Sequence, residues 1–265
     1  MFSLIETLIQ AIIQGITEWL PVSSSGHLVV VQQYLLQEQP PLIFDIALHI
    51  GTLLVIVGVF WKEIASILRA LVRLEFKTEE GKLALFIIVG SIPTAIIGYL
   101  FRDILELFFH SVLVVGIALV VNGFFLFISE RRGDGRELTY LDSLLVGIAQ
   151  GVAIIPGISR SGATIATGLL KRVEKRVTFS FSFLLSVPAI VGAAISESVR
   201  FCASNEVVIS SVDMAALLFG VVVSMIVGYT SLKLLQKLVM RGSFHIFAYY
   251  CWLVGTAIIL GHFLL

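Results

Sequence analysis

Long apolar stretches separated by short polar segments run along most of the chain. A bilayer core of about 30 Å needs roughly 20 apolar residues per helix, so stretches of this length predict membrane-spanning helices. Six stretches meet this requirement: 44–61, 83–101, 112–129, 178–199, 213–235 and 244–264. The pattern therefore predicts an all-α polytopic membrane protein with about six transmembrane helices.

Two further apolar regions, 4–36 and 138–170, are interrupted in the middle by polar and helix-breaking residues. The interruptions are Pro-Val-Ser-Ser-Ser-Gly-His at 21–27 and Pro-Gly-Ile-Ser-Arg-Ser-Gly-Ala-Thr at 156–164. Each half is too short to cross a bilayer. Backbone that leaves the helix at membrane depth needs protein or trapped water to satisfy its N–H and C=O groups. We therefore predict two re-entrant helical hairpins.

The two interrupted regions are similar to each other at an offset of 136 residues. Leu8, Ile12, Gln14, Gly15, Ser23, Ser25 and Gly26 recur as Leu144, Ile148, Gln150, Gly151, Ser159, Ser161 and Gly162. Similar units that enter from opposite faces form an inverted-topology repeat, with the site where the broken helices meet. We predict one integral membrane domain over 1–265, with repeat 1 at about 1–130 and repeat 2 at about 138–265.

The segments around Pro93 and Pro188 look like a further matched pair. Their offset is 95 residues, which implies that the second repeat has lost about 41 residues relative to the first.

The composition excludes a soluble globule, because 58% of the residues are hydrophobic and only 14% are charged. The formal net charge is +0, so no global basic field attracts nucleic acid. The N-terminus lacks a basic region and a cleavage pattern, so the first apolar stretch is expected to stay in the mature protein. Cys202 and Cys251 form no CxxC motif and are expected to be packing residues.

Lys and Arg residues gather on one side of the predicted spans. Fifteen fall on that side, only Arg102 and Arg200 fall on the other, and Arg160 lies inside the second interruption. Positively charged loops stay in the cytoplasm. The predicted cytoplasmic loops are 62–82, 131–137, 171–177 and 236–243. In the cell membrane, the first hairpin would then enter from outside and the second from inside, so that their tips can meet.

Polar residues recur every four positions in the first hairpin, at Gln10, Gln14 and Glu18. On a helix they share one face. The two glutamines fit either a hydrogen-bonded stripe between helices or a polar site. An ionisable residue inside the membrane is a functional candidate by default. Glu18 could hold a divalent cation, Mg²⁺ or Ca²⁺, with Gln14 one turn away, or it could act as a general base.

The first interruption carries Ser23, Ser24 and Ser25, followed by Gly26 and His27. The motif offers three hydroxyls, a glycine that lets the backbone approach a ligand, and an imidazole that can accept or deliver a proton near neutral pH. The alternative is a serine-rich turn with a hydrogen-bonded histidine.

In the second interruption, Ser159 is expected to cap a helix that begins at Arg160. Backbone N–H groups at a helix N-terminus bind anions, and a guanidinium can grip phosphate with two parallel hydrogen bonds. Ser161 and Thr164 add donors on the same turn, so the sequence predicts a phosphate site. The alternative is that Arg160 is a structural counter-ion to Glu18.

Five other positions are less specific. Asp45 and His49 lie four residues apart at the outer end of an apolar segment, which fits a solvated helix end or the lip of a substrate site equally well. His110 and His245 lie near predicted interfaces and are expected to be surface residues, as is His262.

The segments 14–27 and 156–164, Gln-Gly-Ile-Thr-Glu-Trp-Leu-Pro-Val-Ser-Ser-Ser-Gly-His and Pro-Gly-Ile-Ser-Arg-Ser-Gly-Ala-Thr, resemble the motifs of the undecaprenyl-diphosphate phosphatase family, UppP or BacA. The resemblance covers essentially the whole chain. It implies an integral membrane phosphatase that converts a polyprenyl diphosphate to the monophosphate carrier and recycles it for cell-wall synthesis. Gln14 stands where many members have Glu, which leaves one carboxylate here.

The residues and the resemblance together assign the site. The candidate catalytic residues are Glu18, Ser24, His27 and Arg160; the candidate diphosphate-binding residues are Ser23, Ser25, Gly26, Ser159, Ser161 and Thr164; the candidate metal ligands are Glu18 and Gln14. Either Ser24 or an activated water would attack the terminal phosphorus, with His27 as acid or base. Phosphoryl transfer requires mainly positioning and charge stabilisation from the protein.

The expected partners are the lipid diphosphate and membrane lipids, with no nucleic acid, and a homodimer stays open. A second class of function is transport, because inverted repeats and broken helices are typical of transporters, so the chain could instead flip a polyprenyl phosphate. A PAP2-type acid phosphatase is disfavoured, because Ala166 stands where that signature needs a second histidine.

Overall fold

The computed structural model describes residues 4–34, 42–129, 135–203 and 214–264, and these ranges are almost wholly helical. The helices are α1 (Leu4–Thr17), α2 (Ser24–Tyr34), α3 (Leu42–Val59), α4 (Trp61–Val72), α5 (Glu79–Leu100), α6 (Arg102–Phe109), α7 (Val112–Ser129), α8 (Tyr140–Val152), α9 (Arg160–Leu170), α10 (Lys175–Ala203), α11 (Met214–Arg241) and α12 (Ile246–Leu264). The prediction of an all-α protein is confirmed.

The long helices account for the predicted spans. By length and composition, α5, α7, α10, α11 and α12 can each cross a membrane. A sixth candidate is the pair of α3 and α4, which is bent by 80°. The chain is therefore a multi-pass membrane protein with about six spans, as predicted. The segment 62–82 was expected to be a loop, but it contains α4 and the start of α5.

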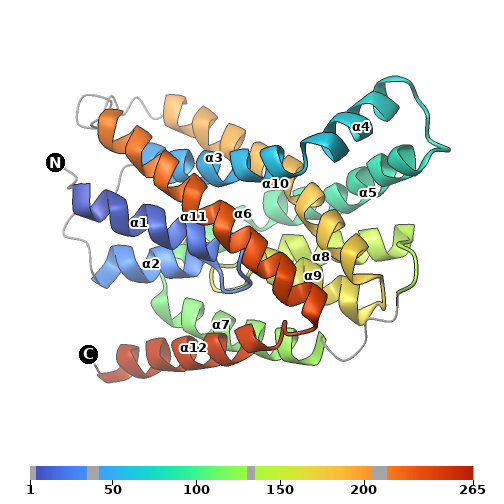
Figure 1. Ribbon diagram of the computed structural model, residues 1–265. Coiled ribbons are helices and arrows are strands. Elements are labelled where there is room, and N and C mark those ends of the chain that lie inside the picture. The colour runs from blue at the N-terminus through green and yellow to red at the C-terminus, as the bar shows by residue number, and fades with distance from the viewer. Residues whose placement is uncertain (1–3, 35–41, 130–134, 204–213, 265) are drawn as a thin grey trace.

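Both predicted interruptions are breaks between paired short helices. The chain leaves α1 after Thr17 and enters α2 at Ser24, and it leaves α8 after Val152 and enters α9 at Arg160. Figure 1 shows the two pairs entering from opposite ends of the molecule, with the breaks in the middle. The breaks touch, because the Gly157 N–H donates a 2.9 Å hydrogen bond to the Ser23 hydroxyl.

The bounds of five helices in the first half match those of five helices in the second half at the offset of 136 residues. At this offset α1 falls on α8, α2 on α9, α3 on α10, α5 on α11 and α7 on α12. The packing follows the same rule, because α1 packs on α11 while α8 packs on α5. The pairing of Pro93 with Pro188 is therefore wrong: these prolines lie in α5 and α10, which are not equivalent at this offset, and no loss of 41 residues is needed.

An ion pair fixes the start of the second hairpin. Arg136 donates from both terminal nitrogens to the Asp142 carboxylate, each at 2.6 Å. Asp142 in turn accepts from the Thr139 backbone N–H, and Thr139 caps α8. This capping box sets the direction in which α8 leaves the polar loop.

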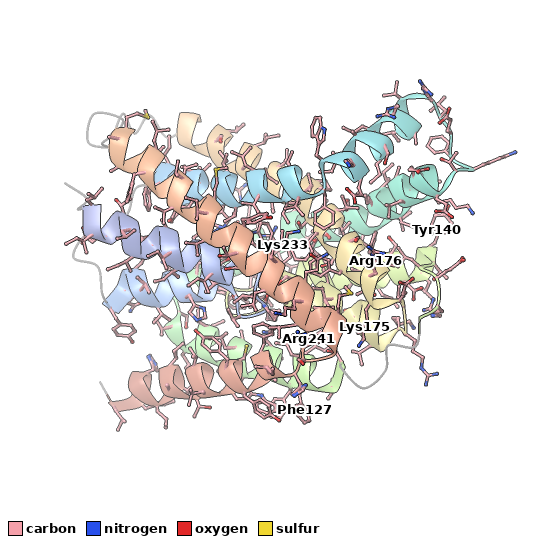
Figure 2. The ribbon with its side chains drawn as sticks, viewed as in Figure 1. Phe127, Tyr140, Lys175, Arg176, Lys233 and Arg241 are labelled. Carbon is pink, nitrogen blue, oxygen red and sulfur yellow. The ribbon has the colours of Figure 1, made fainter. Side chains whose placement is uncertain are left out.

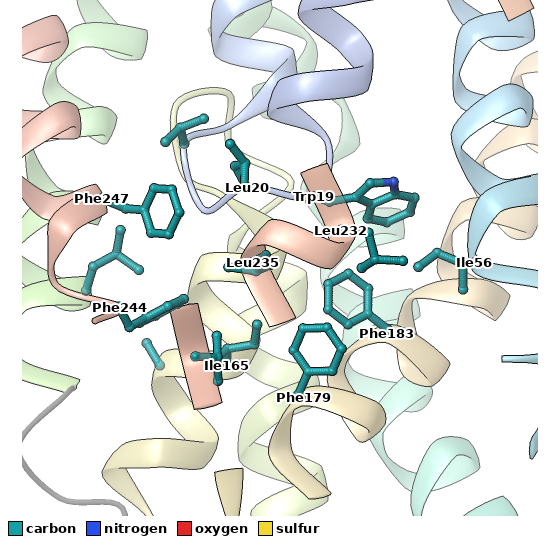
Figure 3. Close-up of a cluster of buried hydrophobic side chains, with 14 of the residues drawn as sticks. Trp19, Leu20, Ile56, Ile165, Phe179, Phe183, Leu232, Leu235, Phe244 and Phe247 are labelled. Carbon is teal, nitrogen blue, oxygen red and sulfur yellow. The ribbon is translucent and has the colours of Figure 1, made fainter. Parts of the chain in front are cut away.

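A cluster of buried apolar side chains packs against the first break (Figure 3). Trp19 lies in the break, and its ring meets Phe183 of α10 edge-on with centroids 5.5 Å apart. Phe183 also contacts Phe179 at 4.6 Å and stacks on Phe60, where α3 turns into α4, at 6.1 Å. Aromatic packing of this kind holds the break rigidly against the long helices.

Small residues let α5 and α8 approach closely. A Cβ added to Gly147 would lie 2.0 Å from the Gly90 carbonyl oxygen. The Thr94 hydroxyl of α5 donates to the Gly147 carbonyl at 2.9 Å. Close contact between small residues is a main source of helix association in membranes.

We expect Gly147→Ala to destabilise the protein by about 1–3 kcal/mol, because the added methyl group forces the two backbones apart. The measurement is thermal unfolding of the purified protein in detergent. Gly192→Ala is the matched control, because a Cβ at Gly192 would meet no atom within 4 Å. Equal unfolding temperatures for the two variants would contradict close packing at Gly147.

Candidate active site

Glu18 is the centre of a polar network at the first break. Its side chain is 2% exposed. One carboxylate oxygen accepts from Arg160 Nη2 at 3.0 Å. The other accepts from the Ser24 hydroxyl at 2.6 Å and from Gln14 Nε2 at 3.0 Å. The structure thus brings three other sequence-predicted residues into contact with one buried carboxylate.

Arg160 begins α9 as predicted. The Ser159 hydroxyl accepts from the Gly162 N–H at 3.2 Å, which confirms Ser159 as the N-cap. The ion pair with Glu18 shows that Arg160 is a counter-ion in this structure. That contact uses one of the five N–H donors of a guanidinium. The Arg160 side chain is also 27% exposed, so donors remain that could bind phosphate.

A small polar cavity lies between the break, α9 and α10. It is bounded by Glu18, Arg160, Ser161 and Thr164, and its volume of about 10 Å³ is close to the minimum for one water. A phosphate group is larger than a water, so binding one there requires the cavity to widen.

Ser182 and Ser186 complete the wall of this cavity from α10. The hydroxyls of Ser182 and Thr164 are hydrogen-bonded to each other. The sequence analysis missed both serines, although two hydroxyls four residues apart in an apolar span form a polar spot on one helix face.

Ser23 and Asn122 hold the two breaks together. Ser23 has a left-handed backbone, with φ 69°, and its hydroxyl accepts from Gly157 in the other hairpin. Asn122 of α7 donates to the Pro21 carbonyl at 3.0 Å and accepts from the Ser159 N–H at 3.3 Å. Ser23 therefore joins the hairpins instead of pointing at an open site. Asn122 was missed, although an amide inside an apolar span is a signal of this kind.

Two histidines, His27 and His49, lie near the network around Glu18 in different positions. His27 contacts the Ser23 carbonyl oxygen and the Tyr250 hydroxyl, each at 2.8 Å. Among the described residues it makes no hydrogen bond to Glu18 or Arg160. His49, for which a solvated helix end was an equal alternative, lies with Nε2 3.7 Å from Glu18. The imidazole nearest the buried carboxylate therefore comes from α3.

The remaining predicted residues lie around this network. The Ser25 hydroxyl contacts that of Ser23 at 3.3 Å, and Gly26 packs on the Gly157 backbone. Gln10 accepts from Gln32 at 3.3 Å, and Gln32 also donates to Asp45. Gln10 thus belongs to a hydrogen-bonded stripe between helices, which was one of the two alternatives.

A divalent cation would find few protein ligands here. No cluster of three or more His, Cys, Asp or Glu side chains occurs within the ranges that the structure describes. Among the described residues, Glu18 is the one carboxylate in the network, and the buried amide oxygen of Gln14 has no hydrogen-bond partner there. One carboxylate and one amide oxygen suit an ion that takes its other ligands from phosphate and water, as Mg²⁺ commonly does.

Comparison with known proteins agrees with these motifs. The family model described as "Bacitracin resistance protein BacA" matches residues 7–257. The chain belongs to the BacA family. Members similar to it include proteins named undecaprenyl-diphosphatase from Carboxydothermus hydrogenoformans and Methanosphaera stadtmanae, each 39% identical. The alignments cover 96% of this chain and 95% of the first relative, and 98% of both proteins for the second.

Another BacA-family relative, the undecaprenyl-diphosphatase of Desulforapulum autotrophicum, is 41% identical over 98% of this chain and 99% of its own length. The similarity therefore extends over both hairpins and all the long helices.

Proposed function

We propose that this chain is an integral membrane phosphatase that hydrolyses undecaprenyl diphosphate, or a related polyprenyl diphosphate, to the monophosphate lipid carrier and inorganic phosphate. The observation that carries the proposal is the 2.6 Å hydrogen bond from the Ser24 hydroxyl to Glu18, beside the Arg160 guanidinium. A hydroxyl paired with a base, next to a fixed cation, is the arrangement that phosphoryl transfer needs. The names of the relatives support the same substrate.

In this mechanism Arg160 and the N–H groups at the start of α9 hold the terminal phosphate. Glu18 accepts the Ser24 proton as the Ser24 oxygen bonds to phosphorus. The bond from that phosphorus to the bridging oxygen breaks, and the lipid monophosphate leaves. Water then hydrolyses the phosphoserine to inorganic phosphate and free Ser24. Direct attack by water with Glu18 as base is the alternative.

His27 remains the proposed acid or base for the leaving group, and this role requires that it release Tyr250 when substrate binds. His49 is a second imidazole near Glu18. A divalent cation, Mg²⁺ or Ca²⁺, held by Glu18 and Gln14 would neutralise diphosphate charge when bound.

The test is phosphate release by the purified protein from prenyl diphosphates of several chain lengths, with and without EDTA. We expect release with long-chain substrates and a loss of activity with EDTA that added Mg²⁺ restores. Transport alone would release no phosphate, so absence of release with every substrate would overturn the proposal. Phosphate release that EDTA does not reduce would refute the role of a divalent cation but leave the proposed phosphatase activity standing.

The Arg160→Lys variant tests whether Arg160 binds phosphate or serves only as a structural counter-ion to Glu18. Lysine keeps the charge opposite Glu18 but loses the planar fork, so we expect turnover to fall at least tenfold, about 1.4 kcal/mol of transition-state stabilisation. The measurement is the steady-state rate beside the unfolding temperature. A near-normal rate in a stable variant would show that Arg160 acts only as a counter-ion.

We propose that the four basic segments face the cytoplasm of the cell membrane. Figure 1 supports a common side, because the connection from α4 to α5 and the start of α10 lie at one end of the molecule, opposite both termini. Cysteines placed in the 62–82 segment should be shielded from an impermeant thiol reagent in intact cells, whereas one at Asn205 should react. The opposite labelling pattern would reverse the entry sides of both hairpins. Position 205 itself lies outside the described residues.

A further inference from the structure

A basic pocket opens where α10 begins and α11 approaches its end. Its volume is about 750 Å³. Four cations line it, Lys175 and Arg176 from α10 with Lys233 and Lys237 from α11, beside the single carboxylate Glu174. Figure 2 labels Lys175 and Arg176 by the start of α10, and Lys233 on α11 nearer the middle of the view. None of them belongs to the network around Glu18.

Among the described residues, the four cations of this pocket outnumber its one carboxylate, Glu174. Within the described ranges, none of the four cations forms an ion pair with a carboxylate, whereas Arg136 and Arg160 each do. Concentrated positive charge in a concave surface raises the local concentration of anions. In the part of the chain that the structure describes, the pocket thus carries excess positive charge that an anionic ligand can neutralise.

The backbone that presents two of these cations is held in place. Arg136 N–H donates to the Arg172 carbonyl, and Glu174 N–H donates to the Arg136 carbonyl, both at 3.0 Å. These bonds tie the segment before Lys175 to the loop that leads into α8. The backbone directly before Lys175 and Arg176 is therefore held by hydrogen bonds to another segment of the chain.

An exposed apolar stripe leads along α11 to the pocket. Leu218, Val222, Ile226 and Tyr229 are 57%, 52%, 62% and 49% exposed. Their spacing of three and four residues puts them on one helix face, and Lys233 is the next residue on that face. The Lys233 ammonium lies 5.7 Å from the centre of the Tyr229 ring. On a membrane span such a stripe faces lipid tails.

We propose that this pocket binds the phosphate headgroup of an anionic phospholipid whose acyl chains lie along the α11 stripe. Basic pockets at the ends of transmembrane helices bind anionic headgroups of the adjacent leaflet. The Arg176 fork and the lysine ammonium groups suit a phosphodiester. A free phosphate ion carries negative charge too, but it has no acyl chains to contact the apolar stripe on α11. The stripe therefore favours a phospholipid over free phosphate as the ligand. The site is independent of the proposed phosphatase activity.

The experiment uses the full-length protein in neutral detergent, with short-chain phosphatidylglycerol, short-chain phosphatidylcholine and inorganic phosphate as probes. Thermal unfolding and native mass spectrometry report binding. We expect phosphatidylglycerol to raise the unfolding temperature and stay bound, and the other two probes to do neither. The double variant Arg176→Gln/Lys233→Gln should bind phosphatidylglycerol about 30-fold more weakly, since each cation near an anionic surface contributes several-fold.

The matched control is Lys62→Gln/Lys82→Gln, which removes two exposed cations from the predicted cytoplasmic side but outside the pocket. We expect it to bind phosphatidylglycerol like the parent. Equal weakening in both double variants would show diffuse surface charge and overturn the proposal. Equal protection by inorganic phosphate and phosphatidylglycerol would overturn it in favour of a soluble-anion site. The rate of phosphate release from the prenyl diphosphate substrate, measured without added phospholipid, should be the same in both double variants and the parent. This result would separate the phospholipid site from catalysis.

Discussion

Glu18→Gln is expected to lower turnover by at least about 100-fold, the usual range for loss of a general base. The amide can still contact Ser24 and Arg160, but it cannot take the Ser24 proton. It also leaves the Arg160 charge without its partner, and breaking a buried pair is strongly destabilising. The unfolding temperature must therefore be measured beside the rate of phosphate release.

Gln14→Ala is the matched control for Glu18→Gln. It removes the 3.0 Å hydrogen bond from Gln14 to Glu18 but keeps the carboxylate, the Ser24 contact and the ion pair. We expect a loss of about tenfold, the value of one hydrogen bond to a charged group, because the carboxylate itself stays in place. Full activity of Glu18→Gln at saturating Mg²⁺ would remove Glu18 from the mechanism. A larger loss in Gln14→Ala than in Glu18→Gln would make the amide the functional group.

The spans and both breaks could be predicted because their causes are local. Twenty apolar residues span a bilayer wherever they occur, and proline, glycine and a serine cluster end a helix through their own backbone preferences. Ser159 is an example, because its N-cap role follows from the residues around it. The bend between α3 and α4 was not predicted, since no proline marks it and Phe60 packs on residues far away in sequence.

The site could be predicted only in part, for a related reason. Glu18, Ser24 and Arg160 stand in two conspicuous motifs, so their meeting followed once the hairpins were expected to touch. His49 and Asn122 reach the same place from α3 and α7, which lie beside the breaks only in the packed structure. His27 was expected at the centre because it ends the first motif, whereas in the structure its Nε2 contacts the Tyr250 hydroxyl of α12.

Ser24→Ala decides whether serine or water attacks phosphorus. If Ser24 is the nucleophile, its loss should lower turnover at least about a thousandfold, because removing a nucleophile disables the whole catalytic unit. The parent protein is mixed with substrate that carries a label in its terminal phosphate, and the reaction is quenched with acid within one turnover. The label should then be found on the protein as phosphoserine at position 24. Ser25→Ala is the control, because the Ser25 hydroxyl contacts Ser23 and not Glu18. Ser25→Ala should keep the labelled phosphoserine, because it leaves the Ser24 hydroxyl and its hydrogen bond to Glu18 in place. If water attacks and Ser24 only orients Glu18, the parent will carry no label and Ser24→Ala will lose about tenfold, the value of one hydrogen bond to a charged group.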